Sequence, residues 1–163
     1  MNTVTIRRFQ PQDQRQVKAL ITRIMDDEFH DEKHAYPMED LQDLGTHYGE
    51  LGESFFVAEN SHQIIGTAGI KKEDSRTALL RRLFVSPEYR KQNVGKKLIH
   101  KAVEFCEEVG YEEIIFKATS RMESAIRMLQ RCGFSQCSKL PAGKIELVKL
   151  LLLLPAGQKK LKA

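Results

Sequence analysis

A strand, a helix and a second strand follow one another in the middle of the chain, and this order limits the folds open to it. The mainly apolar run Thr77–Val85 predicts a long strand, which Pro87 prevents from continuing. Apolar residues at helical spacing predict a helix over Val94–Val109 that ends at Gly110. Glu113–Ala118 then predicts another strand. A strand, a helix and a strand in this order form a crossover connection within one sheet.

Further strands are predicted on both sides of this unit, several of them joined as hairpins. They cover Val4–Arg8, Phe55–Glu59, Ile64–Lys71, Phe134–Ser138 and Lys144–Leu152. Hairpins combined with one crossover predict an α/β protein (an α+β mixed sheet), whose central mixed β-sheet has helices on both faces.

Three more helices complete the predicted set. The first begins at Pro11, and a short second helix passes through Leu41 and Leu44. The last follows Ser120 and Glu123, which match a capping box, and it stops at Gly133.

Length and composition limit the classes of protein to which this chain can belong. The 163 residues suffice for one domain, which we expect over 1–154, followed by a flexible basic tail over 155–163. The apolar run Leu150–Leu154 is far shorter than the ~20 residues of a membrane helix, so no membrane partner is expected. Three cysteines without C-x-x-C spacing, and no signal peptide, favour a cytoplasmic location. His30 and His34 lack an obvious third ligand, so no metal is expected.

The loop before the central helix has the features of an anion site. Amides at a helix start bind anions, Gly95 permits close approach to the backbone, and Asn93 tolerates positive φ. Lysines lie early in this helix and glutamates late, the reverse of what the helix dipole favours. A bound polyanion would make this order favourable, whereas the alternative is a solvated basic face.

This segment resembles motif A of the GNAT acetyltransferases, over Leu83–Lys97. The family loop is Arg/Gln-x-x-Gly-x-Gly/Ala, and here Arg90 and Gly95 match while Asn93 replaces the first glycine. Ser120–Phe134, which ends in Cys-Gly-Phe, is similar to motif B. The resemblance implies the GNAT acyl-CoA N-acyltransferase fold, and acetyl-CoA as donor. It implies coenzyme contacts from Leu83, Phe84, Val85, Arg90, Lys91, Gln92, Asn93, Val94, Gly95 and Lys96.

The chain departs from the family pattern at its proton-transfer positions. Leu79 stands where many members have a glutamate base, and Leu129 where many have a tyrosine acid. The catalytic residues are therefore unknown. Glu73, Asp74 and Tyr36 are candidates, and a water chain, His30 or His34 are alternatives.

Charge gives conflicting indications about the acceptor, an amine of a small molecule or a protein. The segment Asp26–Asp43 has eight acidic residues and one lysine, hence a charge of −7, in a chain of net charge +4. It favours a cationic amine, whereas Arg81 or Arg82 could face the cleft and favour a carboxylate.

The sequence leaves other functions and assemblies open. The two leucines at the proton-transfer positions also fit a catalytically weak or silent acyl-CoA-binding module. The pI of about 9.0 would suit nucleic acid, but no recognition helix or aromatic strip supports such a partner, so no nucleic acid is expected. The oligomeric state stays open, with a homodimer as one option.

Overall fold

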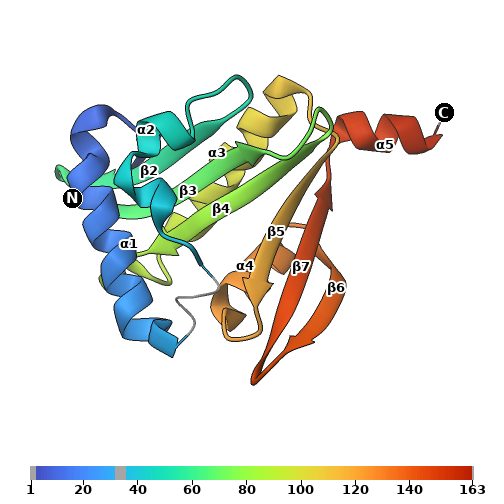
Figure 1. Cartoon of the computed structure of the whole chain (residues 1–163). Coiled ribbons are helices and arrows are strands. Elements are labelled where there is room, and N and C mark those ends of the chain that lie inside the picture. The colour runs from blue at the N-terminus through green and yellow to red at the C-terminus, as the bar shows by residue number, and fades with distance from the viewer. Residues whose placement is uncertain (1–2, 32–35, 163) are drawn as a thin grey trace.

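The computed structural model describes residues 3–31 and 36–162, and over these residues the chain forms one mixed sheet (Figure 1). Its strands lie in the order β1-β2-β3-β4-β5-β7-β6. β4 and β5 pair in parallel, and every other neighbouring pair is antiparallel. The strands are β1 (Thr5–Arg8), β2 (Ser54–Asn60), β3 (Gln63–Lys72), β4 (Thr77–Val85), β5 (Glu113–Thr119), β6 (Ser135–Ala142) and β7 (Ile145–Leu153). The predicted mixed sheet and its crossover are confirmed.

Helices cover both faces of the sheet, as predicted. α1 (Gln14–Glu28) and α2 (Leu44–His47) pack on one face through Val17, Ile21 and Leu44. α3 (Val94–Val109) and α4 (Glu123–Arg131) lie on the other, where Leu98 and Leu129 join the larger core cluster. Short 3₁₀ helices cover η1 (Pro11–Asp13), η3 (Glu39–Gln42) and η4 (Pro87–Tyr89). Apolar residues at helical spacing therefore determine which side of each helix is buried.

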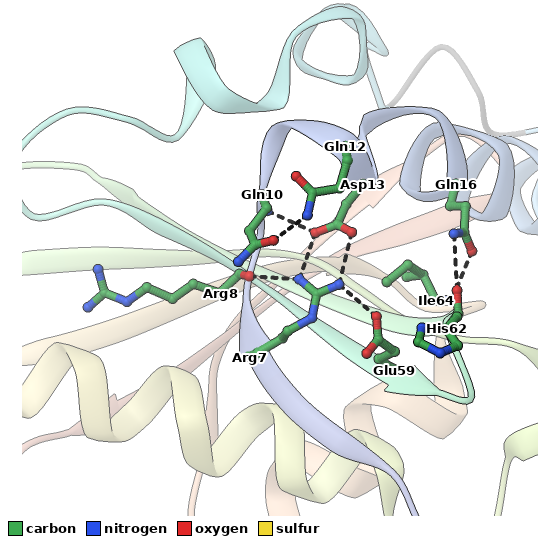
Figure 2. Close-up of polar contacts among 9 residues, drawn as sticks. All are labelled: Arg7, Arg8, Gln10, Gln12, Asp13, Gln16, Glu59, His62 and Ile64. Carbon is green, nitrogen blue, oxygen red and sulfur yellow. Dashed lines mark hydrogen bonds and ion pairs between the residues drawn. The ribbon is translucent and has the colours of Figure 1, made fainter.

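The start of α1 is anchored to the sheet by polar contacts (Figure 2). Both Nη atoms of Arg7 donate to the carboxylate of Asp13, over 2.8 and 2.9 Å, and Nη2 also donates to Glu59 over 2.8 Å. A turn later, Gln16 Oε1 accepts from the backbone N–H of Ile64 at 2.9 Å. Bidentate arginine–carboxylate contacts have well-defined geometry. They hold α1 in place, and its C-terminal end lines the site described below.

The predicted capping box at Ser120 is wrong. α4 begins at Glu123, Met122 is its N-cap residue, and no side chain caps it. The Ser120 hydroxyl instead accepts from the N–H of Glu146 at 3.0 Å, and the Ser120 N–H donates to the Glu146 carbonyl at 2.8 Å. Ser120 therefore extends the β5–β7 pairing.

Residues after Leu154, expected as a flexible tail, are helical in the structure. α5 runs over Pro155–Lys162, and the N–H of Gln158 donates to the Leu154 carbonyl at 3.0 Å. Proline suits the first turn of a helix. Gly157 is buried against the Glu112 backbone, where a Cβ would lie 2.3 Å from the carbonyl oxygen. The absence of a side chain allows α5 to pack this closely.

Candidate active site

The parallel strands β4 and β5 separate halfway along their length (Figure 1). Their pairing ends at Leu80 and Phe116, although β4 continues to Val85 and β5 to Thr119. The register between β3 and β4 also shifts at this point, between Thr67 and Gly69. Such a β-bulge bends a strand. It directs the second half of β4 away from β5 and opens a V-shaped gap.

A buried ion pair holds the bulge. Arg82 has a φ of 53°, and its carbonyl accepts from Thr67 Oγ1 at 2.7 Å. Its guanidinium donates to the two carboxylate oxygens of Asp40 over 2.5 and 2.9 Å and to the Pro37 carbonyl over 2.6 Å. The Tyr48 hydroxyl donates to Asp40 at 2.6 Å. The network fixes η3 and the segment before it against β4.

Burial alone would raise the pKa of Asp40. The hydrogen bonds from Arg82 and Tyr48 outweigh burial and hold the pKa of Asp40 below its usual value. The carboxylate is therefore charged at neutral pH, and Arg82 is neutralised by it. The Arg82 guanidinium is consequently engaged within the protein, and the charge of Arg81 beside it also helps to lower the pKa of Asp40.

One groove, here the loop groove, lies between the end of β4, the loop before α3, and α4. It has a volume of about 600 Å³. The loop enters α3 through two residues of positive φ, Lys91 at 63° and Asn93 at 65°. No side chain caps α3, whose first-turn amides include that of Gly95. The expected tolerance of Asn93 for this backbone conformation is confirmed.

The loop groove is strongly basic. Cationic side chains line it from the loop, from the turn before α4, from α3 and from α4, and among the described residues the acidic side chain that lines it is Glu28. The cations are Arg90, Lys91, Lys96, Arg121, Arg127 and Arg131. A groove of this charge that ends on a helix N-terminus has the chemistry to bind phosphate groups.

The structure brings most of the predicted coenzyme residues together in the loop groove. Of the ten, all but Gln92 line it; the Gln92 amide donates to the Glu88 carbonyl at 3.3 Å. Arg90 has a structural partner there, because its guanidinium donates to Glu28 over 2.7 and 2.8 Å. Sequence reasoning missed the contribution of α4, although Arg127 and Arg131, four residues apart, signalled a basic helix face.

Gly95 has a different close neighbour from the one expected. A Cβ at this position would lie 2.6 Å from both Sδ and Cε of Met128. The glycine thus admits a side chain from α4, and this side chain is flexible. A ligand that approaches the Gly95 backbone would have to displace the end of Met128.

A second groove, here the sheet groove, follows the gap between β4 and β5 and extends over β7. Its volume is about 550 Å³. Leu83, Phe84 and Met122 line both grooves, so the two meet at the end of β4. A group in one groove can therefore reach a group in the other beside the Leu83–Phe84 backbone.

The three candidate catalytic residues do not lie together. Tyr36 lines the sheet groove, and its hydroxyl lies 3.0 Å from Met122 Sδ and 3.2 Å from the Thr119 amide nitrogen. Glu73 and Asp74 lie at the β3–β4 turn, where the Asp74 carboxylate accepts from the Thr77 N–H at 2.9 Å. With ~3.3 Å per strand residue, this turn is roughly 25 Å from the junction of the grooves. Only Tyr36 is placed to act there.

The two leucines at the family's proton-transfer positions have different surroundings. Leu79 lines the sheet groove, so no carboxylate occupies the expected position of a base. Leu129 is fully buried in the core and lines neither groove. His34 and part of the acidic segment lie outside the described residues. Within the described residues, no cluster of three or more His, Cys, Asp or Glu could hold a metal ion.

Comparisons with known proteins bear on the family and the fold. The sequence model of the acetyltransferase (GNAT) family matches residues 19–134. Human N-acetyltransferase 8 is 31% identical over 103 residues, which cover 60% of this chain and 45% of that protein. The probable N-acetyltransferase camello of Xenopus laevis is 27% identical over 112 residues, covering 67% and 51%. The chain spans about half the length of these curated relatives.

Solved structures share the fold. A GNAT-family acetyltransferase from Staphylococcus aureus Mu50 superposes with a TM-score of 0.81 at 23% identity, covering 93% of this chain and 99% of that one. A putative acetyltransferase from Salmonella typhimurium, solved with its cofactor acetyl-CoA, has a TM-score of 0.79 at 16% identity, covering 94% and 95%. The chain belongs to the acetyltransferase (GNAT) family, as its two motifs predict. No helix among the described residues is long and apolar enough to cross a membrane.

Proposed function

We propose that this chain is an N-acetyltransferase that moves the acetyl group of acetyl-CoA to a primary amine by direct attack. The observation that carries the proposal is the meeting of the two grooves at Leu83, Phe84 and Met122. Phosphate groups of the donor suit the basic loop groove, and the acceptor amine suits the sheet groove. The Salmonella protein solved with acetyl-CoA supports this choice of donor.

The residues of the chain position the reactants at the junction. Backbone amides near Phe84 and Val85, on the far side of the bulge, would hold the developing oxyanion of the thioester carbonyl. The amine nitrogen bonds to the acetyl carbon, the carbon–sulfur bond breaks, and the amine loses one proton while the thiolate gains one. The products are an amide and free coenzyme A thiol. Placing both reactants at one point supplies much of the acceleration.

The proposed function is tested by incubating the protein with acetyl-CoA and a panel of amines. We expect time-dependent release of thiol that depends on the amine, with the acetylated amine identified by mass spectrometry. Binding of acetyl-CoA in calorimetry without thiol release from any amine would contradict the proposal. That outcome would instead favour the catalytically weak or silent acyl-CoA-binding module.

Tyr36 is the residue that we propose as proton donor to the departing thiolate. Its hydroxyl contacts Met122, one of the three residues at the junction of the grooves. Tyr36→Phe is expected to lower kcat about tenfold with the KM for acetyl-CoA unchanged, because only the proton donor is removed. Tyr111→Phe is the matched control, since the Tyr111 hydroxyl donates to the Gly52 carbonyl, outside both grooves. An unchanged kcat in Tyr36→Phe would assign protonation to water.

A further inference from the structure

Three cations form a row across the floor of the sheet groove. Lys117 of β5 lies directly opposite Lys149 of β7, and Leu80 and Phe116 are the last paired residues of β4 and β5. Arg81 follows Leu80 and Lys117 follows Phe116, so both lie just beyond the last paired residues, where β4 and β5 separate. All three cationic side chains line the sheet groove. The non-local pairing of strands therefore creates a positive strip that starts beside the junction of the grooves.

No carboxylate in the described part of the chain forms an ion pair with this row. No ion pair is recorded for Arg81, Lys117 or Lys149, and no Asp or Glu lines the sheet groove. The nearby carboxylate of Asp40 forms its ion pair with Arg82, although the charge of Arg81 also acts on it. Like charges directly opposite each other on neighbouring strands are destabilising. An anion bound between them would remove that repulsion.

We propose that the acceptor is a primary amine that carries a carboxylate and an apolar substituent, an inference that rests on the proposed function. The carboxylate binds the row of Arg81, Lys117 and Lys149, and the amine points along β4 toward Leu83 and Phe84. The apolar substituent lies on Leu79 and on the exposed side chains of Leu140 and Leu147. An amine with this chemistry is an α-amino acid with an apolar side chain, or a close analogue.

Three acids of the segment that favoured a cationic acceptor have other partners in the structure. Glu28 binds Arg90 of the loop groove, and Asp40 is buried against Arg82. Asp43 accepts from the N–H and the hydroxyl of Thr46 at the start of α2. The described acids whose contacts are known therefore serve the fold, and the charge that faces the sheet groove is positive.

The positive row also bears on how the amine loses its proton. Among the described residues that line the sheet groove there is no carboxylate, so we look to the positive row for an effect on the amine. Nearby positive charges disfavour an ammonium ion and thereby favour the neutral, nucleophilic amine. A bound α-amino acid keeps its amine within a few bonds of the carboxylate, and thus near the row. One set of charges then serves both recognition and activation.

The test compares L-phenylalanine with phenylalaninamide, which lacks the carboxylate charge. We expect kcat/KM to be at least about tenfold higher for the acid. Lys149→Gln should lower kcat/KM for L-phenylalanine about tenfold, mainly through KM, and lower that for the amide by much less. Lys139→Gln is the matched control, since Lys139 is on the neighbouring strand, is exposed and does not line the groove. Equal use of acid and amide, or an equal loss in the control, would overturn the inference.

A binding measurement separates this inference from the proposed function. The probe is 3-phenylpropionate, which has the carboxylate and the ring but no amine, with 3-phenylpropionamide as its neutral counterpart. We expect the carboxylate to raise the Tm of the wild type but not of the Lys117→Gln/Lys149→Gln double variant, and the amide to raise neither. A carboxylate-specific shift without turnover of any amine would retain the anion site and refute the proposed function. Turnover of an amine without a carboxylate-specific shift would retain the proposed function and refute the anion site.

Discussion

Replacing Asp40 with alanine is expected to lower the free energy of unfolding by about 3–5 kcal/mol. The substitution leaves the Arg82 guanidinium buried without its counter-charge, and removes the acceptor of the Tyr48 hydroxyl. Arg82 is 7% exposed and Asp40 5%, so water cannot replace the lost partner cheaply. Urea denaturation of both proteins at neutral pH gives the difference directly.

The control is Asp43→Ala, which removes an exposed carboxylate from the same segment. Asp43 accepts from Thr46 at the start of α2, so about 1 kcal/mol is expected from its loss. Adding Arg82→Met to Asp40→Ala should recover part of the stability, because the unpaired buried charge is then absent. A loss below about 1 kcal/mol for Asp40→Ala would show that the pair contributes no more than a surface pair does.

The Asp40–Arg82 ion pair also makes the stability of the protein depend on pH. The pKa of Asp40 in the folded protein lies below its usual value, owing to the hydrogen bonds from Arg82 and Tyr48 outweighing burial. Its stabilisation is therefore fully present above about pH 4, near the pKa of an unfolded aspartate, and is lost as the pH falls through the lowered pKa. The difference in stability between the wild type and Asp40→Ala should shrink in that acidic range.

Local sequence signals were sufficient for the elements that carry the site. The predicted bounds Thr77–Val85 and Val94–Val109 agree with β4 and α3, because a proline, a glycine and one apolar stripe mark them. The prediction at Ser120 failed because a serine near a helix start can equally extend a strand pairing, and here it pairs with Glu146. A capping pattern alone does not distinguish the two.

The rest of the candidate site depends on contacts that are distant in the sequence. Lys117 and Lys149 come together only because β5 and β7 pair in one register, and a shift of one residue would move one lysine to the other face. Arg82 turns from a candidate ligand contact into a buried partner of Asp40, 42 residues away. The distance between Glu73 and the site likewise depends on which end of β4 separates from β5. Spacing along the chain carries no information about these pairings.

The second large effect is expected from Gly95→Glu, which should weaken acetyl-CoA binding at least about 100-fold. Gly95 is buried at the start of α3, and first-turn amides at this point of the loop groove are the proposed contacts of the pyrophosphate. A glutamate there would repel the phosphates and could itself bind those amides. Its Cβ would also meet the side chain of Met128, so less room would remain for the ligand.

The fold should tolerate this change better than the binding does. No acidic residue occupies the first turn of α3, and a carboxylate near a helix N-terminus interacts favourably with the helix dipole. The contact that must yield is the flexible end of Met128. The matched control is His100→Glu, which adds the same charge to an exposed position of α3 that lines neither groove. Calorimetry with acetyl-CoA should find the control close to wild type. If Gly95→Glu melts like the wild type and binds acetyl-CoA equally well, the pyrophosphate does not lie at the start of α3.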